Sequence, residues 1–327
     1  MERIHPRIFL LSLALLLMAP AATAATKDPA HDPDQIGSRD VGKGVNFYSI
    51  EREIGLGKEM ARETEREAKM IDDAIVTEYV SRLVQNLARH SDAKVPFTVK
   101  VVDSDEVNAF ALPGGFTFVN SGLILQTGNE AELAGVLAHE IAHVAARHGT
   151  RQATRGQLIN YSTIPLIFMG GWAGYAVRQA VNLAVPMGFL KFSRNMEAEA
   201  DLLGLQYMYK SGYDPVEFVN FFERVETLEK SKPGTISKLF STHPMTGSRI
   251  HAAQKEIQQD LKAQPQYVLD TSEFHAVRTR LIEIGNRVKL REDPGRPVLH
   301  TRAPAKAEQS ADEGASDDQR PTLKRAN

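Results

Sequence analysis

Apolar residues recur at helical spacing along most of this chain and alternate in only one short stretch. Residues 50–90 read as two helices. The first is heavily charged with both signs interleaved, which is typical of a helix face exposed to solvent. The second carries an apolar stripe for packing against a core, formed by Val76, Val80, Leu83, Val84 and Leu87.

The alternating stretch predicts β-structure. Residues 97–102 come directly after Pro96 and alternate as a strand does. Residues 110–112 and 116–120 flank a Pro-Gly-Gly turn, and this pattern is typical of a β-hairpin. A small sheet is therefore expected immediately before the next helix.

The helix after this sheet is predicted from its start signal and its period. Asn129 followed by Glu132 resembles a capping box, and Glu130 adds negative charge to the first turn. Gly149 offers a C-terminal stop. The positions expected to face a core are Leu133, Val136, Leu137, Ile141 and Val144.

Further helices are expected over residues 195–210, 215–229, 249–261 and 272–288. With this majority of helices and one small sheet, the expected fold class is α+β and mostly helical. Residues 158–190 are mostly apolar but are interrupted by Pro165, glycines and polar residues. We favour a buried or cleft-lining helical hairpin there over a membrane span, and peripheral membrane contact through this segment stays open.

The two ends of the chain have their own character. Arg3 and Arg7 precede an apolar run, and Ala22-Thr23-Ala24 resembles a cleavage site, so residues 1–24 are predicted to be a signal peptide that directs export to the periplasm. An uncleaved anchor is the alternative. Residues 25–45 are rich in Asp, Pro and Gly and are expected to form a flexible leader, and residues 292–327 a disordered tail.

Composition narrows the chemistry. The 327 residues carry 39 basic and 41 acidic side chains, a net charge of −2, so no basic excess points to a nucleic-acid partner. There are no cysteines, which excludes disulfides, a thiolate zinc site, a cysteine nucleophile and a lipidated cysteine. Metal ligands must therefore come from His, Asp and Glu.

The most informative motif is H-E-x-x-H, from His139 to His143, within the helix predicted after the sheet. Positions four apart lie on one helix face, so His139 and His143 can offer imidazole nitrogens to one metal ion. Glu140 is rotated about 100° away, because a helix turns by that angle per residue. It can therefore accept a proton from a water molecule that the metal polarises.

A hydrolytic zinc site needs a third protein ligand. The motif that supplies it as a later histidine fails here, because Gly149 occupies that position and His148 is one residue out of register, where it reads as a helix-end residue. The best candidate is Glu197, with Asp201 one turn later to fix the tautomer of a ligand histidine. Glu199 points to the opposite face. The alternative is an acidic, solvated helix face.

These motifs, in this order, resemble the gluzincin zinc metallopeptidase family of the HtpX, CAAX prenyl protease and BepA type. The resemblance covers residues from about 45 to 260. The matching segments are Asn108 to Gly115, His139 to His143, Glu197 to Asp201, and Thr242-His243-Pro244 followed by Arg249. The chain lacks a multi-span topology and a tetratricopeptide-like array, so it is most similar to the single-domain periplasmic members.

The resemblance implies a gluzincin-type metallopeptidase domain over residues 46–262, followed by a helical extension over 263–291. One zinc ion per chain would be bound by His139, His143 and Glu197, with Glu140 as catalytic base. His243 and Arg249 would stabilise the negatively charged oxygen that forms during the reaction. In BepA-like relatives the histidine of this motif can instead cap the zinc and hold the enzyme latent.

The substrate is expected to bind by backbone pairing along a strand edge formed by Asn108, Ala109 and Phe110, unless this strand is internal. Together these expectations describe a zinc endopeptidase of the cell envelope that acts on polypeptides, misfolded or unassembled ones in particular. The alternative is a zinc-containing quality-control or chaperone-like binding protein that is latent as a protease. A zinc hydrolase of non-peptide substrates is a weaker third option.

Overall fold

The structure, a computed structural model, describes residues 29–167, 192–231, 243 and 246–292. The chain forms one compact unit up to residue 284 and a second unit from residue 285, whose described part is the end of the last helix. The predicted signal peptide and residues 293–327 of the predicted tail lie outside the described residues, as does most of the predicted hairpin at 158–190.

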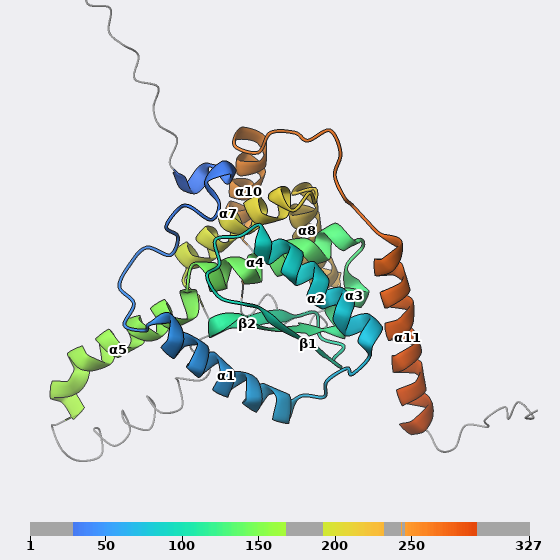
Figure 1. Ribbon diagram of the computed structural model, residues 1–327, viewed down its shortest axis with the longest axis horizontal. Helices are drawn as coiled ribbons and strands as arrows, with labels where there is room; N and C mark the ends of the chain where they lie inside the picture. The colour runs from blue at the N-terminus through green and yellow to red at the C-terminus, as the bar shows by residue number, and fades with distance from the viewer. Residues whose placement is uncertain (1–28, 168–191, 232–242, 244–245, 293–327) are drawn as a thin grey trace, which may run out of the picture. The chain divides into compact units, whose positions relative to one another are not determined.

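Helices make up most of the described chain (Figure 1), which confirms the expected fold class. In chain order they are α1 (Ile50–Glu67), α2 (Ala74–Arg89), α3 (Ser121–Gln126), α4 (Glu130–Ala145), α5 (His148–Ile167), α7 (Arg194–Lys210), α8 (Val216–Ser231), α10 (Gly247–Gln259) and α11 (Ser272–Glu292). Short 3-10 helices lie at Pro29–His31, Pro33–Gln35 and Pro113–Gly115. None of the helices within the described ranges is long and apolar enough to cross a membrane.

The sheet has three strands, β1 (Thr98–Val102), β2 (Ala109–Leu112) and β3 (Phe116–Asn120), in the order β1-β3-β2. β2 and β3 form the predicted antiparallel hairpin, with Phe110 opposite Phe118. β1 runs parallel to β3, which the sequence did not predict. Because β3 is central, β2 keeps one edge without a strand partner among the described residues.

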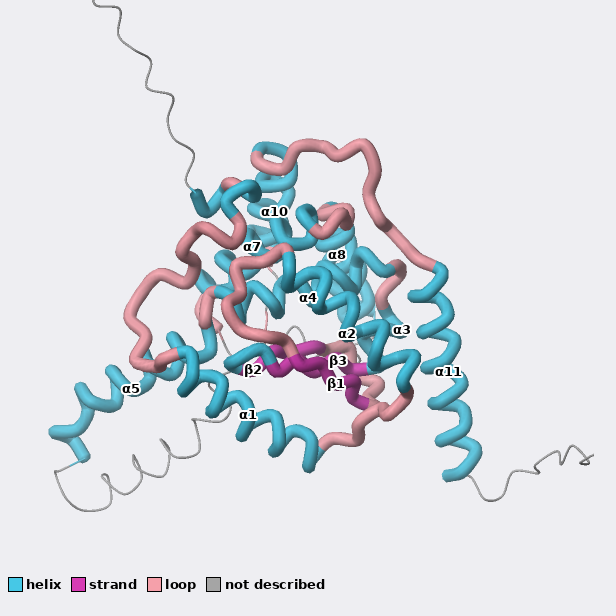
Figure 2. The backbone as a smooth tube through the Cα atoms, in the orientation of Figure 1, coloured by secondary structure: helices cyan, strands magenta, loops and turns pink. Residues whose placement is uncertain are grey.

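The sheet lies between α1 on one side and α2 and α4 on the other, as Figures 1 and 2 show. α1 sits directly on the hairpin turn, because Gly57 has no side chain there: a Cβ at this position would be 1.7 Å from the carbonyl oxygen of Pro113. Side chains from α2, α4, α7, α8 and α11 form the main hydrophobic core. α4 is therefore enclosed, and each of its 16 residues is buried.

The ends of α4 follow from local interactions. The Asn129 side chain accepts from the backbone nitrogen of Glu132 at 2.9 Å, as the capping pattern predicts. The Glu132 carboxylate in turn accepts from the nitrogen of Gly128 at 2.6 Å. The predicted stop at Gly149 is wrong: α4 ends at Ala145, and Arg147 takes a left-handed conformation with a φ of 56° before α5 begins.

The segment predicted to be a flexible leader differs from that expectation where it is described. Arg39 is buried, and its Nε lies 2.9 Å from Asp92 Oδ2 while its Nη1 donates to Gln206 Oε1 at 2.6 Å. Residues 29–45 thus belong to the compact unit. Residues 263–284 belong to it as well, since Phe274 and Val277 of α11 lie in the main core. The physical reason is that a buried, ion-paired arginine fixes a segment whose composition alone suggests mobility.

Candidate metal centre

His139 and His143 lie one turn apart on α4 and share a face, as their spacing predicts. Their Nε2 atoms are 3.0 Å apart, and both side chains are almost completely buried. Burying polar side chains is unfavourable unless they find partners, so two imidazoles inside an enclosed helix require an explanation. Their Nε2 atoms converge on one point, where both could share a common partner.

Glu197 on α7 reaches the same point from the opposite side. Its Oε2 lies 3.5 Å from His139 Nε2, and its Oε1 lies 3.6 Å from His143 Nε2. α7 can approach this closely because Gly204 faces the backbone of α4: a Cβ at Gly204 would be 3.0 Å from the nitrogen of His139. Burial opposes ionisation of Glu197, but hydrogen bonds from His139 and His243 hold its pKa well below the usual range.

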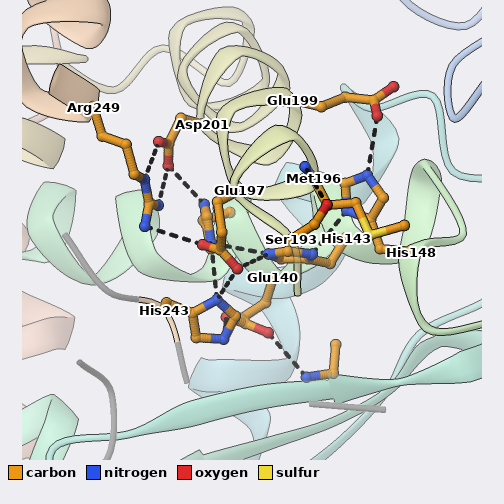
Figure 3. A network of polar contacts seen from close by, with 12 residues as sticks. Glu140, His143, His148, Ser193, Met196, Glu197, Glu199, Asp201, His243 and Arg249 are labelled. Atoms are coloured by element: carbon orange, nitrogen blue, oxygen red, sulfur yellow. Dashed lines mark hydrogen bonds and ion pairs between the residues drawn. The ribbon is translucent and has the colours of Figure 1, made fainter. Parts of the chain in front are cut away.

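Asp201 lies behind His139, one turn beyond Glu197. Its Oδ1 is 3.1 Å from His139 Nδ1, whereas the other ring nitrogen of His139, Nε2, faces His143 and Glu197. Figure 3 shows Asp201 beside Arg249 and Glu197. Arg249 of α10 donates to Asp201 through two hydrogen bonds of 2.6 Å each, and its Nη1 lies 3.1 Å from Glu197 Oε2. Burial raises the pKa of Asp201, but Arg249 and His139 outweigh it and keep the carboxylate ionised.

These carboxylates also act on His139. Burial alone would lower the pKa of the imidazole, yet Asp201 and Glu197 outweigh that effect and raise the pKa to about 9. Burial and the positive charge of His139 lower the pKa of His143 far below its usual value. In the absence of a metal, proton binding at this pair therefore favours His139 over His143.

His243 completes the cluster from a segment far along the chain. Its Nδ1 lies 3.0 Å from Glu197 Oε1 and 3.4 Å from His139 Nε2. The structure thus brings His139, His143, Glu197 and His243 together, with one possible ligand atom from each within 4.8 Å of the others. His243 is also placed beside Glu140, with its Nε2 3.6 Å from Glu140 Oε1.

Glu140 lies next to this cluster without joining it. Its Oε2 accepts from the backbone nitrogen of Ala111 at 3.1 Å, which ties α4 to the hairpin. Its Oε1 is buried and has no hydrogen bond. Burial raises the pKa of Glu140, while His243 and His139 oppose the increase. A buried carboxylate with an open acceptor and a raised pKa is suited to take up and return a proton.

The donor set fits a zinc ion. Imidazole nitrogens and a carboxylate oxygen are the ligands of hydrolytic zinc sites, and a chain without cysteine has no others to offer. Glu140 Oε1 is buried and makes no hydrogen bond, whereas the buried Glu197 Oε2 has an ion pair with Arg249. Buried polar atoms are nearly always paired, so the open acceptor of Glu140 marks a place for a further group. His139, His143 and Glu197 would hold the metal, with His243 adjacent.

β2 presents its free edge to this site. The nitrogen of Ala111 points toward Glu140, while Asn108 uses its carbonyl oxygen to accept from Asn120 of β3 at 3.0 Å. The side chains of Asn108 and Ala109 are buried, and Asn108 Oδ1 makes no hydrogen bond. Among the described strands, β2 is therefore an edge strand, as the substrate-binding prediction requires.

The sequence did not predict the contacts that two further residues make behind His143. His148 is fully buried, with its Nδ1 2.8 Å from His143 Nδ1, and its Nε2 lies 3.1 Å from Glu199 Oε2. We expected His148 to be only a helix-end residue and Glu199 to point away. A histidine five residues after His143 does not share its helix face, and only the left-handed turn at Arg147 brings the two rings together.

Comparison with known proteins agrees with this geometry. The profile of peptidase family M48 matches residues 74–257. The beta-barrel assembly-enhancing protease of Yersinia pestis is 32% identical over 258 residues, which cover 76% of this chain and 52% of the relative. A putative beta-barrel assembly-enhancing protease of Vibrio cholerae is 32% identical over 283 residues, covering 83% and 56%.

A shorter match is found with a mitochondrial protein. The mitochondrial metalloendopeptidase OMA1 of Saccharomyces cerevisiae is 37% identical over 155 residues, which cover 45% of this chain and 43% of the relative. The chain spans about half the length of the curated relatives that it matches. The family profile includes α4, α7 and most of α10, the helices that carry the side chains of His139, Glu140, His143, Glu197, Asp201 and Arg249. By its motifs, its fold and these matches, the chain belongs to peptidase family M48.

Proposed function

We propose that this protein is a zinc-dependent endopeptidase of the bacterial cell envelope. The observation that carries the proposal is the buried Glu140 Oε1, which lacks a hydrogen bond and lies beside four convergent ligand atoms. A site that only binds a metal has no use for such an acceptor. The predicted signal peptide and the names of the two bacterial relatives support a location in the envelope.

In the proposed hydrolysis of a peptide bond, Glu140 carries out the proton transfers. When bound, zinc supplies Lewis-acid polarisation of the attacking water and of the substrate carbonyl. Glu140 accepts a proton from the water molecule while the water oxygen bonds to the carbonyl carbon of the peptide. Glu140 then returns this proton to the amide nitrogen, and the carbon–nitrogen bond breaks. The product is a new carboxylate and a free amine.

Two neighbours prepare the ligands for this chemistry. Asp201 Oδ1 lies 3.1 Å from His139 Nδ1, so its negative charge favours a proton on Nδ1 and leaves Nε2 free for the metal. Arg249 was expected to stabilise the reacting oxygen, but its guanidinium lies against Asp201 and Glu197. We therefore assign it a positioning role, in which its charge balances two buried carboxylates. The task of stabilising the reacting oxygen falls to His243.

The free edge of β2 is the proposed binding place for an extended substrate. A peptide backbone can pair with the outward-facing groups of Ala109 and Ala111, as peptides do at other sheet edges. In the described structure the nitrogen of Ala111 donates to Glu140. A substrate that pairs with this nitrogen would replace that hydrogen bond and lie next to the proposed base. Misfolded or unassembled envelope proteins expose such extended segments, and they are the proposed substrates.

The first experiment compares the mature protein with its Glu140→Gln variant for casein cleavage and zinc content. The expected result is about one zinc in each and a loss of at least about 100-fold in cleavage for the variant, because a general base contributes that much or more. Zinc in both proteins with equal cleavage would contradict the role of Glu140. Absence of zinc from both would contradict the ligand assignment.

A latent, binding form is the second candidate, favoured by His243 Nδ1. This nitrogen lies with the other ligand atoms rather than facing open space. As a fourth ligand it would occupy the position that a water molecule needs. The variant His243→Ala separates the candidates: faster casein cleavage supports a cap, whereas slower cleavage with zinc retained supports a role in stabilising the reacting oxygen.

A further inference from the structure

His148 lies behind His143, on the side away from the ligand cluster. The two Nδ1 atoms are 2.8 Å apart, and Phe192 stacks on the His143 ring with centroids 4.1 Å apart. On the far side of His148, its Nε2 lies 3.1 Å from Glu199 Oε2. These residues therefore form one hydrogen-bonded line that starts at a metal ligand and ends at a carboxylate (Figure 3).

The proton positions along this line follow from the chemistry of its ends. His143 must keep the lone pair of Nε2 for the metal, so its proton sits on Nδ1. That proton is donated to His148 Nδ1, which must then be the acceptor nitrogen of a neutral ring. The proton of His148 sits on Nε2 and is donated to Glu199. Each hydrogen bond along this line therefore joins one donor to one acceptor.

We infer that His148 and Glu199 are positioning residues that fix the tautomer and ring orientation of His143, and that Gly42 of the N-terminal leader holds Glu199 in place. The inference rests on the ligand assignment in the proposed function. The Asp201 carboxylate contacts His139 directly. The Glu199 carboxylate contacts His143 only through the intervening imidazole of His148. The two ligand histidines are thus supported by different parts of the chain.

The N-terminal leader contacts Glu199 through the backbone of Gly42. The nitrogen of Gly42 donates to Glu199 Oε1 at 3.0 Å, and Arg151 Nη1 lies 3.2 Å from Glu199 Oε2. Gly42 has a φ of +73°, and a Cβ on it would be 2.2 Å from the carbonyl oxygen of Ala146. The backbone of the leader at Gly42 therefore packs closely against the C-terminal end of α4. It lies before residue 74, so the support of His143 includes a segment outside the matched family profile.

The test measures zinc affinity rather than activity. Each zinc-free protein is titrated with zinc in competition with a chelator of known affinity, after its fold has been checked by circular dichroism. Glu199→Gln and His148→Gln are expected to weaken zinc binding about 10- to 100-fold, as loss of an outer hydrogen-bond partner does. Glu199→Gln is disruptive because every partner of Glu199 is a donor, so the new amide NH₂ must face one of them.

Gly42→Ala tests the leader, and Gly37→Ala is its matched control. Both glycines have positive φ values, 73° and 86°, so alanine strains both backbones alike. Only position 42 has a neighbour that the new Cβ would strike. Gly42→Ala is expected to weaken zinc binding several-fold, and Gly37→Ala to leave it unchanged. The exposed Glu223→Gln is the corresponding control for Glu199→Gln.

A purely structural role would lower the melting temperature of the zinc-free variants and leave the zinc affinity of the folded protein unchanged. That result for Glu199→Gln would overturn the inference even if His148→Gln does not fold. A parent protein that binds zinc but does not cleave casein would contradict the proposed endopeptidase activity alone, because the affinity series still tests the positioning role. A parent that binds no zinc would overturn both.

Discussion

Gly204 on α7 lies so close to His139 on α4 that a Cβ at position 204 would be 3.0 Å from the backbone nitrogen of His139. Glu197 and Asp201 stand on the same helix as Gly204. The separation of the two helices at this glycine therefore sets how far the Glu197 and Asp201 carboxylates reach toward His139.

Gly204→Ala is expected to separate α7 from α4, because the methyl group meets backbone atoms that have no rotamer to change. Overpacking of this kind costs about 1–3 kcal/mol. Denaturant unfolding measures the loss, and the zinc titration described above should show weaker binding as well. Gly156→Ala on α5, where a Cβ would have nothing within 4 Å, is the control. Equal stability of the two variants would contradict the close approach.

Arg249→Met is expected to be strongly destabilising in the zinc-free protein. Asp201 would lose two hydrogen bonds of 2.6 Å, and Glu197 its nearest cation. Removing one partner of a buried ion pair costs about 3–5 kcal/mol, because the remaining charge stays buried. Denaturant unfolding without zinc is the measurement. Arg280→Met removes a surface pair with Asp73 and should have a smaller effect, and a similar loss in both would show that burial does not matter here.

Removal of the metal is expected to lower thermal stability. A ligand that binds only the folded state stabilises it by about 2.7 kcal/mol at 100 times its dissociation constant. A chelator should therefore reduce the melting temperature, and added zinc should restore it. Glu140→Gln should show the same shift, since Glu140 is not a ligand. A melting temperature that does not respond to the chelator would contradict a zinc site.

Glu256 is expected to make stability depend on pH. Burial raises its pKa above the ordinary 4.5, and Asp260 adds to the increase against hydrogen bonds from Gln206 and His31. Because the folded-state pKa is the higher one, the folded protein binds more protons than the unfolded chain over this range. The stability from this group is complete below pH 4.5 and is lost as the pH rises through the raised value.

Denaturant unfolding over a series of pH values tests this sign. The groups that face Glu256 are His31, Asp260 and Gln206, and Arg39 donates to Gln206 from behind. Glu256→Gln cannot ionise, so its unfolding free energy should fall less than that of the parent as the pH rises from about 4.5. The exposed Glu223→Gln should follow the parent. A steeper decline in Glu256→Gln would contradict the prediction.

Much of the site could be predicted because its spacing is local. His139 and His143 share a face, and Glu197 and Asp201 share another, because residues four apart on a helix always do. The capping residue Asn129 and the hairpin around the Pro-Gly-Gly turn are local signals too, and the structure confirms both. Local geometry thus determined which side chains could act together on each element.

Other features depended on contacts between distant segments. The parallel pairing of β1 with β3, the burial of Arg39 and the placement of Arg249 against Asp201 have no signal in the local pattern. His148 was missed because its partnership with His143 needs the left-handed turn at Arg147. Each of these is decided by long-range packing, which the period of a single element does not encode.

The sequence by itself therefore determined the helices, the hairpin and the types of side chain available for metal chemistry, because these follow from residue spacing and donor atoms. Only the tertiary structure decided that His148 lies between His143 and Glu199, and that Gly42 donates to Glu199. The physical reason is that an outer hydrogen-bond partner can come from any segment that packing brings within about 3 Å.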